Sequence, residues 1–365
     1  MSKKKGVRPS ASAALRKDIE RIDRDLAKVL ADRTKAAERL AKARLDDGQP
    51  PFDAAEEQTS LAAFLNHHKG PLPEAAARLL YRGLVSASRA LVKQTRVAYL
   101  GPQYSYSHLA AIERFGENAE LVAVSSIRTV FEEIQSRQSE FGLVPIENST
   151  DGRIIDTLDM FARLPVRISG EVQLRVHHNL LAKCPRAEIT EVYSKPQAIS
   201  QCREWIARHL PGVRVVEMSS TAVAAQIACD KPGAAAIASL QAGMHYGLNI
   251  VDANIEDSKT NITRFAVLGG PPTKRTGKDK TALMLEIPHK PGSLADALVV
   301  FKKARLNMTW IESFPMPGPK PEYLFYIEFE GHADEPRISR ALDLLKRRCV
   351  RLEVLGSYPK AEPLE

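Results

Sequence analysis

The sequence contains few residues of the kinds that indicate a metal centre, a disulfide framework or a membrane span. Its 365 residues include only four cysteines, and none has the CxxC spacing of a metal or redox motif. We therefore expect free thiols in a reducing, cytoplasmic compartment and no metal site. No apolar run approaches the ~20 residues needed to cross a bilayer, and the basic start lacks the apolar stretch of a secretory signal. No membrane partner is expected.

Acidic residues are too few to balance the basic ones, which gives a formal charge of +8. Residues 1–48 hold 14 Lys and Arg against eight Asp and Glu, so this segment carries most of the excess. Its charges alternate in sign along a predicted helix, and no aromatic residues lie between them. This pattern is typical of a solvated helix face, so a nucleic-acid partner is not expected. The chain length allows two or three domains of ~100 to 200 residues each.

A basic tail over residues 1–11 precedes an uninterrupted helical pattern. Apolar or small residues recur at three- and four-residue steps up to Gly48, namely Leu15, Ile19, Ile22, Leu26, Val29, Ala37 and Leu40. Two further helices are predicted, at about residues 53–66 and 73–95. Arg33 and Arg44 continue the apolar series of the first helix. They favour either an anion-binding interior or two side chains that reach water from the edge of the apolar seam.

This set of one long and two shorter helices resembles the all-helical chorismate mutase family over about residues 12–95. Members are intertwined dimers that bind a dianion between helices, so the resemblance implies chorismate as a substrate and a homodimer or homotetramer. The implied substrate-binding side chains are Arg16, Arg33, Arg44, Asp53 and Glu57. The family has a lysine at Arg44, an arginine at Glu56 and a glutamine or glutamate at Val92. Either an active mutase or a degenerate domain that serves dimerisation fits this pattern.

From Arg96 the pattern changes to short β-rich runs that alternate with helical stretches. Such alternation predicts mainly parallel sheets covered by helices. Two sets of strands and helices flank a middle section, RISGEVQLRVHHNLLA, that reads as extended segments crossing between them. Two α/β lobes joined in this way normally bind a small ligand in the cleft between them.

Hydroxyl and amide side chains lie at the predicted strand ends, where open α/β sheets collect their ligand sites. The motifs are GPQYSYSH from Gly101, VPIENST from Val144, VYSKPQ from Val192 with SQC from Ser200, SST from Ser219 and NITRF from Asn261. Each alone reads as a turn or a helix N-cap. In this order they resemble the prephenate dehydratase family over about residues 96–270, which implies a two-lobed α/β domain similar to periplasmic binding proteins. One departure is Tyr104, which stands where the family usually has glycine.

This second resemblance implies conversion of prephenate to phenylpyruvate, water and carbon dioxide in phenylalanine synthesis, without a cofactor. Aromatisation supplies the driving force, so a neutral hydroxyl that donates to the departing oxygen could suffice. Thr263 is the implied donor. The implied substrate-binding side chains are Ser107, Glu147, Asn148, Ser149, Ser194, Gln201 and Arg264. Strand geometry leaves open whether Arg264 faces the cleft. Arogenate, the 2-amino counterpart of prephenate, remains an alternative substrate.

Residues 271–280 are rich in Gly, Pro and Lys and read as an exposed linker. The strand–helix–strand–strand–helix–strand order over residues 281–358 predicts a ferredoxin-like α+β domain. HKPGSLADAL and IESFP resemble an ACT regulatory domain, which implies a phenylalanine effector site at a subunit interface. The implied effector-binding residues are Gly292, Ser293, Leu294, Glu312 and Ser313. Phe314 stands where that family commonly has arginine. The alternatives are a plain dimerisation domain, or a non-catalytic amino-acid sensor for the whole chain.

Overall fold

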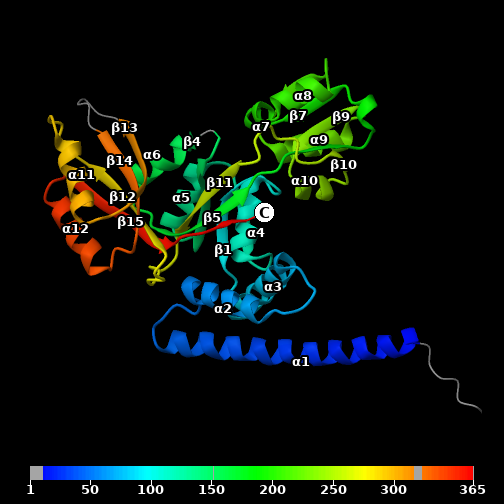
Figure 1. The fold of residues 1–365 in the computed structure, drawn as a ribbon, viewed down its shortest axis with the longest axis horizontal. Coiled ribbons are helices and arrows are strands. Elements are labelled where there is room, and N and C mark those ends of the chain that lie inside the picture. Colours follow the sequence, from blue (N-terminus) through cyan, green and yellow to red (C-terminus); the bar gives the residue numbers. More distant parts are fainter. Residues whose placement is uncertain (1–10, 151, 316–322, 365) are drawn as a thin grey trace, which may run out of the picture.

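The computed structural model describes residues 11–150, 152–315 and 323–364. Residues 1–10 of the expected basic tail lie outside this part of the chain. The chain forms, from its N-terminus onwards, a helical domain, a two-lobed α/β region and a C-terminal α/β domain (Figure 1). Within the described residues, no helix combines the length and the apolar character needed to cross a membrane.

The helical domain consists of one long and two shorter helices, as the sequence predicts. They are α1 (Ala11–Asp46), α2 (Ala54–His67) and α3 (Glu74–Val92). The third helix packs against both others, but the N-terminal part of α1 extends beyond them. Six apolar side chains along α1 are more than half exposed within one chain: Leu15, Ile19, Ile22, Leu26, Val29 and Leu40.

The first α/β lobe is a mixed sheet with the strand order β16-β5-β11-β3-β1-β2, and β4 pairs with β3. Its strands are β1 (Arg96–Leu100), β2 (Glu120–Val124), β3 (Phe141–Asn148), β4 (Gly152–Arg153), β5 (Ile168–Arg175), β11 (Ile262–Gly269) and β16 (Pro363–Leu364). The accompanying helices are α4 (Tyr106–Phe115), α5 (Ile127–Gln135) and α6 (Ile155–Arg163). Because β1 is parallel to β2 and β3 while β11 is antiparallel to β3, three strand ends meet the start of β11.

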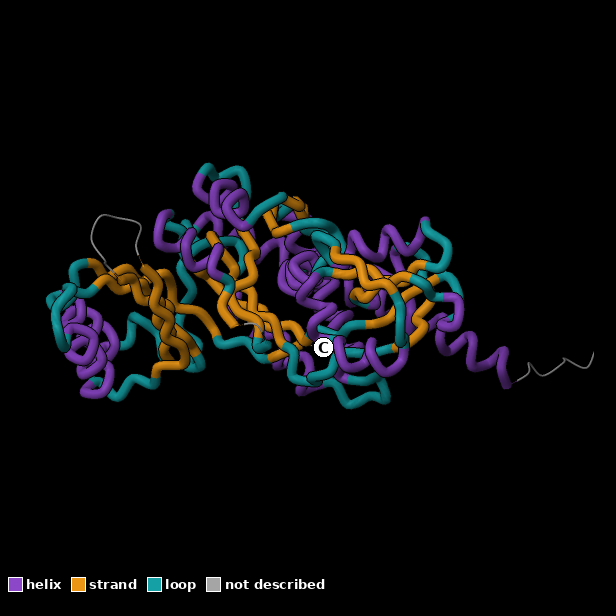
Figure 2. Tube along the Cα trace, turned by 90° about the horizontal axis from the view of Figure 1, so that it is seen from above, coloured by secondary structure: helices purple, strands orange, loops and turns teal. Residues whose placement is uncertain are grey.

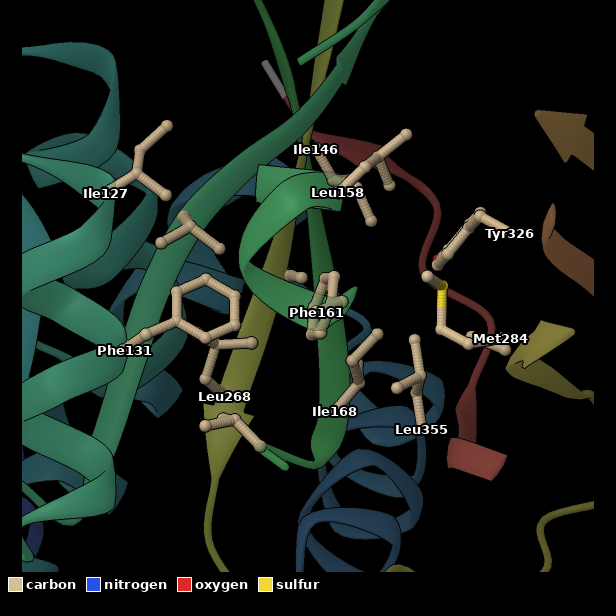
Figure 3. Packing of buried hydrophobic residues seen from close by; sticks show 14 of the residues in the cluster. Ile127, Phe131, Ile146, Leu158, Phe161, Ile168, Leu268, Met284, Tyr326 and Leu355 are labelled. Atoms are coloured by element: carbon tan, nitrogen blue, oxygen red, sulfur yellow. The ribbon is translucent and has the colours of Figure 1, made fainter. Parts of the chain in front are cut away.

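Helix α5 shows how the local sequence determines these elements. Ser126 caps the helix by accepting a hydrogen bond from the Thr129 amide at 3.1 Å. Ile127, Val130 and Phe131 follow at helical spacing and are buried. The apolar face of α5 therefore packs into the core of the first lobe, as Figure 3 shows for Ile127 and Phe131.

The second lobe is a five-stranded sheet with the order β10-β6-β9-β7-β8. Its strands are β6 (Asn179–Ala182), β7 (Glu191–Ser194), β8 (Arg214–Glu217), β9 (Ala234–Ala238) and β10 (Asn249–Asp252). Its helices are η1 (Arg186–Glu188), α7 (Pro196–Gln201), α8 (Arg203–His209), α9 (Thr221–Asp230) and α10 (Leu240–His245). The chain crosses between the lobes twice, after β5 and before β11. The Val176 amide donates to the Asn261 carbonyl at 2.8 Å, which joins the two crossings.

The C-terminal domain has the ferredoxin-like βαββαβ order and the strand order β13-β14-β12-β15. Its elements are β12 (Asp279–Glu286), α11 (Ser293–Lys303), β13 (Met308–Pro315), β14 (Tyr323–Glu330), α12 (Pro336–Lys346) and β15 (Arg351–Pro359). One sheet face packs on its two helices. The other packs on the first lobe, where Met284, Tyr326 and Leu355 share a cluster with Phe161 and Ile168 (Figure 3).

Two boundaries of this domain differ from the expectation. Residues 279 and 280 are not exposed linker, because Asp279 and Lys280 begin β12 and are about 95% buried. The chain also continues past residue 358 and returns to the first lobe, where Pro363 and Leu364 form β16 in parallel with β5. Figure 2 shows the C-terminal domain at one end of the molecule and the last described residues back near its middle.

Candidate functional site

A cavity of about 590 Å³ lies between the two lobes. The first lobe lines it with the carboxyl ends of β1, β2 and β3, the start of β11 and the first turn of α4. The second lobe contributes the first turns of α7 and α9. Its size falls within the range of small-molecule sites, and its position is the one expected for an open α/β sheet.

Helix N-termini face the cavity from both lobes. Ser105 caps α4 by accepting from the His108 amide at 3.4 Å, and Ser220 caps α9 by accepting from the Val223 amide at 3.1 Å. The first-turn amides beyond these caps have no acceptor within their helices, and Ser107 and Thr221 line the cavity there. Each lobe therefore offers a site suited to one carboxylate.

A directed series of hydrogen bonds determines the role of the Thr263 hydroxyl. The Thr150 backbone amide donates to Asn148 Oδ1 at 3.0 Å, so the oxygen and nitrogen of this side chain are assigned. Asn148 Nδ2 then donates to Asn261 Oδ1 at 3.0 Å and to Thr263 Oγ1 at 2.8 Å. Thr263 accepts this bond, so its hydroxyl does not donate to Asn148. No other acceptor for its proton lies among the described residues. Thr263 lines the cavity and can donate into it.

The series continues from the first lobe into the second. Asn261 Nδ2 donates to Gln201 Oε1 at 2.8 Å, and His178 Nε2 lies 2.8 Å from the same oxygen. His178 must therefore carry its proton on Nε2. Burial lowers the pKa of His178, so the ring is neutral at neutral pH. These contacts hold the lobes together at the base of the cleft.

Tyr104 forms a second contact between the lobes. Its φ of 63° is in the left-handed region, which glycine adopts more readily than a residue with a side chain. The Tyr104 ring stacks on His245 of α10, with a centroid distance of 3.9 Å and an interplanar angle of 22°. A backbone conformation that costs about 1 to 2 kcal/mol for a side chain is thus accompanied by an aromatic contact across the cleft.

The structure brings together half of the side chains expected at the dehydratase site. Thr263, Asn148, Gln201 and Ser107 line the cavity. Ser194 does not line it, because it is fully buried at the end of β7 and donates to the Ile237 carbonyl of β9 at 2.6 Å.

Ser149 is also placed outside the cavity. Its Oγ donates to the Thr260 carbonyl at 2.7 Å and accepts from the Ile262 amide at 2.9 Å. These two contacts fix the segment that leads into β11. Ser149 thus supports the strand that carries Thr263 rather than the substrate itself.

Arg264 and Glu147 lie on the opposite side of the sheet, so the expectation that they bind substrate is corrected. Arg264 Nη1 is 2.6 Å from Glu147, and Arg264 Nη2 is 2.9 Å from Glu171 and 2.7 Å from Glu328 of β14. Lys280 of β12 lies 3.3 Å from Glu171. Burial alone would lower the pKa of Arg264, but Glu328 and Glu171 raise it well above its usual value. The residue after Thr263 is therefore bound to the C-terminal domain.

The side chains expected at the mutase site pair with neighbours outside the expected set. Arg33 Nη1 donates to Ser88 Oγ at 2.8 Å. Arg44 pairs with Glu56, which the sequence analysis noted as a departure, and Glu57 pairs with Arg89. Arg44 and Asp53 also line a cavity of about 160 Å³ beneath the first lobe.

Arg16 cannot share a site with Arg33 in one chain. Both lie on the continuous helix α1, and 17 residues at 1.5 Å per residue separate them by about 25 Å. Any substrate contact by Arg16 must therefore be made in a site that belongs to another copy of the chain.

Three of the five expected effector residues meet in one place. Gly292, Ser293 and Leu294 line a cavity of about 360 Å³ at the start of α11. Glu312 and Ser313 do not line it. Glu312 pairs instead with Arg153 of β4, in the hairpin that holds Glu147 and Asn148.

Three residues at or next to the cleft were not predicted as site residues, although the sequence segments that contain them were identified. Asn261 and Lys195 lie within NITRF and YSKPQ, and His178 lies within the extended segment RISGEVQLRVHHNLLA. The positions of Lys195 and His178 along the cavity, and the contact of Asn261 with Gln201, depend on where the two crossings bring the second lobe. The available signal for Lys195 was its charge, which only Glu147 and Arg264 share among the Asp, Glu, Lys and Arg positions of the recognised motifs.

The fold and the cleft define a class of two-lobed α/β proteins with a small-ligand site between the lobes, here with a helical domain and a ferredoxin-like domain attached. Residues 97–273 match the family model of prephenate dehydratase, and residues 15–93 match that of chorismate mutase type II. A bifunctional chorismate mutase/prephenate dehydratase of Aquifex aeolicus (strain VF5) is 40% identical over 352 residues, which covers 95% of this chain and 97% of that protein. The chain belongs to the family of bifunctional chorismate mutase/prephenate dehydratases.

Two solved structures resemble the part of the chain beyond the helical domain. A prephenate dehydratase of Arthrobacter aurescens in complex with L-Phe has 32% identity and a TM-score of 0.68, and the match covers 73% of this chain and 90% of that one. GqqA, described as a novel type of quorum quenching acylase, has 28% identity and a TM-score of 0.66, with coverage of 73% and 98%.

Proposed function

We propose that the protein converts prephenate to phenylpyruvate in the cleft between its lobes, with Thr263 as the donor to the departing hydroxyl group. The observation that carries this proposal is the direction of the hydrogen bonds around Thr263. Asn148 donates to the Thr263 oxygen, so the Thr263 proton remains for a ligand in the cavity. All four cysteines are free, which supports a cytoplasmic enzyme.

The reaction requires the loss of two groups from one ring. The bond from the ring to its carboxylate breaks and releases carbon dioxide, and the electron pair of this bond enters the ring as the carbon–oxygen bond breaks. The departing oxygen accepts a hydrogen bond from Thr263 and takes a proton from solvent to leave as water. Prephenate dianion and one proton thus give phenylpyruvate monoanion, carbon dioxide and water. One donor placed at a developing oxyanion typically contributes about 3 to 4 kcal/mol.

Acylase activity, as named for GqqA, finds less support in this cleft. A nucleophilic hydroxyl needs an adjacent base to take its proton. Thr263 accepts from an amide, and none of the cavity's Ser or Thr hydroxyls that the structure describes bonds to a histidine ring. Donation by Thr263 therefore fits the arrangement better than attack by it.

The helical domain is proposed to act as a mutase only in a dimer. The exposed apolar stripe of α1 needs a partner surface, and the position of Arg16 requires a site shared between chains. The relatives named for both activities support chorismate as the substrate of this domain. Because Glu56 already neutralises Arg44, a domain that retains only the dimer contact is the alternative.

The C-terminal domain is proposed to be an ACT domain that binds phenylalanine. The complex of the Arthrobacter aurescens protein with L-Phe supports this, as does the cavity at Gly292, Ser293 and Leu294. Phe314, which replaces a commonly found arginine, is 92% buried in the cluster that joins this domain to the first lobe. A thermal-shift titration tests the site: phenylalanine at millimolar concentration should raise the melting temperature, and no shift would contradict the proposal.

One set of assays tests the catalytic proposals. The full chain is supplied separately with chorismate, prephenate and arogenate, and the release of phenylpyruvate or phenylalanine and the loss of chorismate are measured. We expect phenylpyruvate from prephenate. Absence of product from both prephenate and arogenate would support the sensor alternative instead.

A further inference from the structure

The cleft differs from most of the protein surface in its charge. The described residues that line it include no aspartate or glutamate, and Lys195 has the only permanently charged side chain among them. Glu147, the nearest candidate in the strand-end motifs, faces Arg264 on the other side of the sheet. His178 is neutral because burial lowers its pKa. The lining thus carries one positive charge and hydrogen-bond donors.

Lys195 is placed to meet a ligand in this cavity. It follows β7 directly and precedes the first turn of α7, with its backbone in the extended conformation. Lys195 is exposed and lines the cavity, and no carboxylate in the described part of the chain pairs with it. An ammonium group without an ion pair in an otherwise uncharged site is suited to an anionic substituent.

We infer that Lys195 determines specificity by binding the side-chain carboxylate of a 2-oxo acid, so that the cleft prefers prephenate to its 2-amino counterpart, arogenate. This inference rests on the proposed dehydratase function. A cation beside the ring carboxylate would stabilise a charge that disappears as carbon dioxide leaves, and would oppose the reaction. The carboxylate of the pyruvyl side chain keeps its charge throughout, so Lys195 can bind it equally in substrate and transition state.

The same geometry disfavours an amino group. In arogenate an ammonium is attached to the carbon next to this carboxylate and would lie close to Lys195. Like charges a few ångströms apart repel, and the described lining offers no carboxylate as a counter-ion. Prephenate brings two negative charges to the cleft, whereas arogenate brings a net charge of only one.

The test compares the full-length protein with Lys195→Gln, Lys195→Arg and the control Lys183→Gln, using both substrates. Lys183 is an exposed lysine of the same lobe that does not line the cavity, so its loss changes the overall charge equally. We expect Lys195→Gln to raise KM for prephenate by roughly 10- to 100-fold while kcat changes less than about threefold, because uniform binding is lost. The ratio of kcat/KM for prephenate over arogenate should fall about tenfold or more. Lys195→Arg should retain most of the affinity, and Lys183→Gln should match the parent.

Three outcomes would overturn the inference. The first is an unchanged KM for prephenate in Lys195→Gln. The second is an equal loss of kcat/KM for prephenate and arogenate in that variant. The third is a loss of kcat/KM for prephenate in Lys183→Gln that is as large as the loss in Lys195→Gln. In each case the parent protein still makes phenylpyruvate, so the dehydratase proposal survives. A parent protein that transforms neither substrate would overturn both proposals.

Discussion

Arg264, the neighbour of Thr263 in β11, donates from Nη2 to both carboxylate oxygens of Glu328 in the C-terminal domain, at 2.7 and 3.0 Å. Glu328 is fully buried, and the Tyr326 and Tyr358 hydroxyls also donate to it. Residues on successive positions of one strand thus face the cleft and the C-terminal domain respectively. A change in that domain can reach the strand of Thr263 through one buried ion pair.

Replacing Arg264 should strongly destabilise this junction. Arg264→Met removes the ion pair of Glu147 and leaves Glu171 and Glu328 with Lys280 as a nearby cation. We expect a loss of about 3 to 5 kcal/mol in the free energy of unfolding, measured by urea denaturation. Glu330→Gln is the matched control, because Glu330 lies at the exposed end of β14, the strand that also carries Glu328. This substitution should lower the free energy of unfolding by less than about 1 kcal/mol. Equal effects for the two variants would contradict the importance of the buried network.

The pH dependence of stability should report Glu171. Burial alone would raise the pKa of Glu171, but Arg264 and Lys280 lower it below its usual value. A carboxyl group with a depressed folded-state pKa stabilises the protein above its unfolded pKa, and this contribution is lost as pH falls through the folded value. The unfolding free energy of the parent should therefore exceed that of Glu171→Gln at pH 6, and the gap should narrow towards pH 3.5. A constant gap would contradict the lowered pKa.

The hydroxyl of Thr263 should be essential for turnover but not for folding. Thr263→Val has nearly the same shape and lacks the donor, so we expect kcat for prephenate to fall by about two to four orders of magnitude. Thr263→Ser keeps the hydroxyl and should retain substantially more activity. Single-turnover formation of phenylpyruvate measures both. Comparable rates for Thr263→Val and the parent would exclude Thr263 as the donor.

Asn148→Asp tests the direction of the hydrogen bond rather than its presence. A carboxylate at this position can only accept, so the Thr263 hydroxyl would donate to residue 148 and no longer into the cavity. We expect kcat to fall nearly as far as in Thr263→Val at pH 7, although the two side chains have almost the same size. Partial recovery at lower pH, where the new carboxyl group can be protonated, is expected in this variant alone.

Mixing two inactive variants should restore mutase activity if the site is shared between chains. Arg16→Ala and Arg33→Ala should each lose chorismate turnover. In a mixed dimer, one site contains both mutations and the other contains neither. Refolding the variants together in equal amounts should give about a quarter of the parent activity, because half of the dimers are mixed and each has one intact site. No recovery, with mixed dimers verified by mass spectrometry of tagged chains, would place Arg16 outside the site.

The domain order, the helices and most strands follow from sequence patterns because these depend on neighbours in the chain. The burial of Ser194 at the end of β7 and the orientation of Arg264 do not, since they depend on partners 43 and 64 residues away. The same holds for the end of the linker. The sequence predicts that Lys280 is solvated, but in the fold it is buried beside Glu171 and Glu328. Polar residues with distant buried partners were therefore the ones that sequence reasoning misplaced.

The return of the chain to form β16 has a consequence during synthesis. Strand β5 is complete at Arg175, but its outer edge is covered by residues 363 and 364, about 190 positions later. At about 5 to 20 residues per second, a ribosome leaves that edge uncovered for roughly 10 to 40 s. An unpaired strand edge can recruit other chains, so this interval is when the nascent protein is most exposed to aggregation and to chaperones. Ribosome-bound chains stalled before and after residue 364 should therefore differ in their protection from proteolysis.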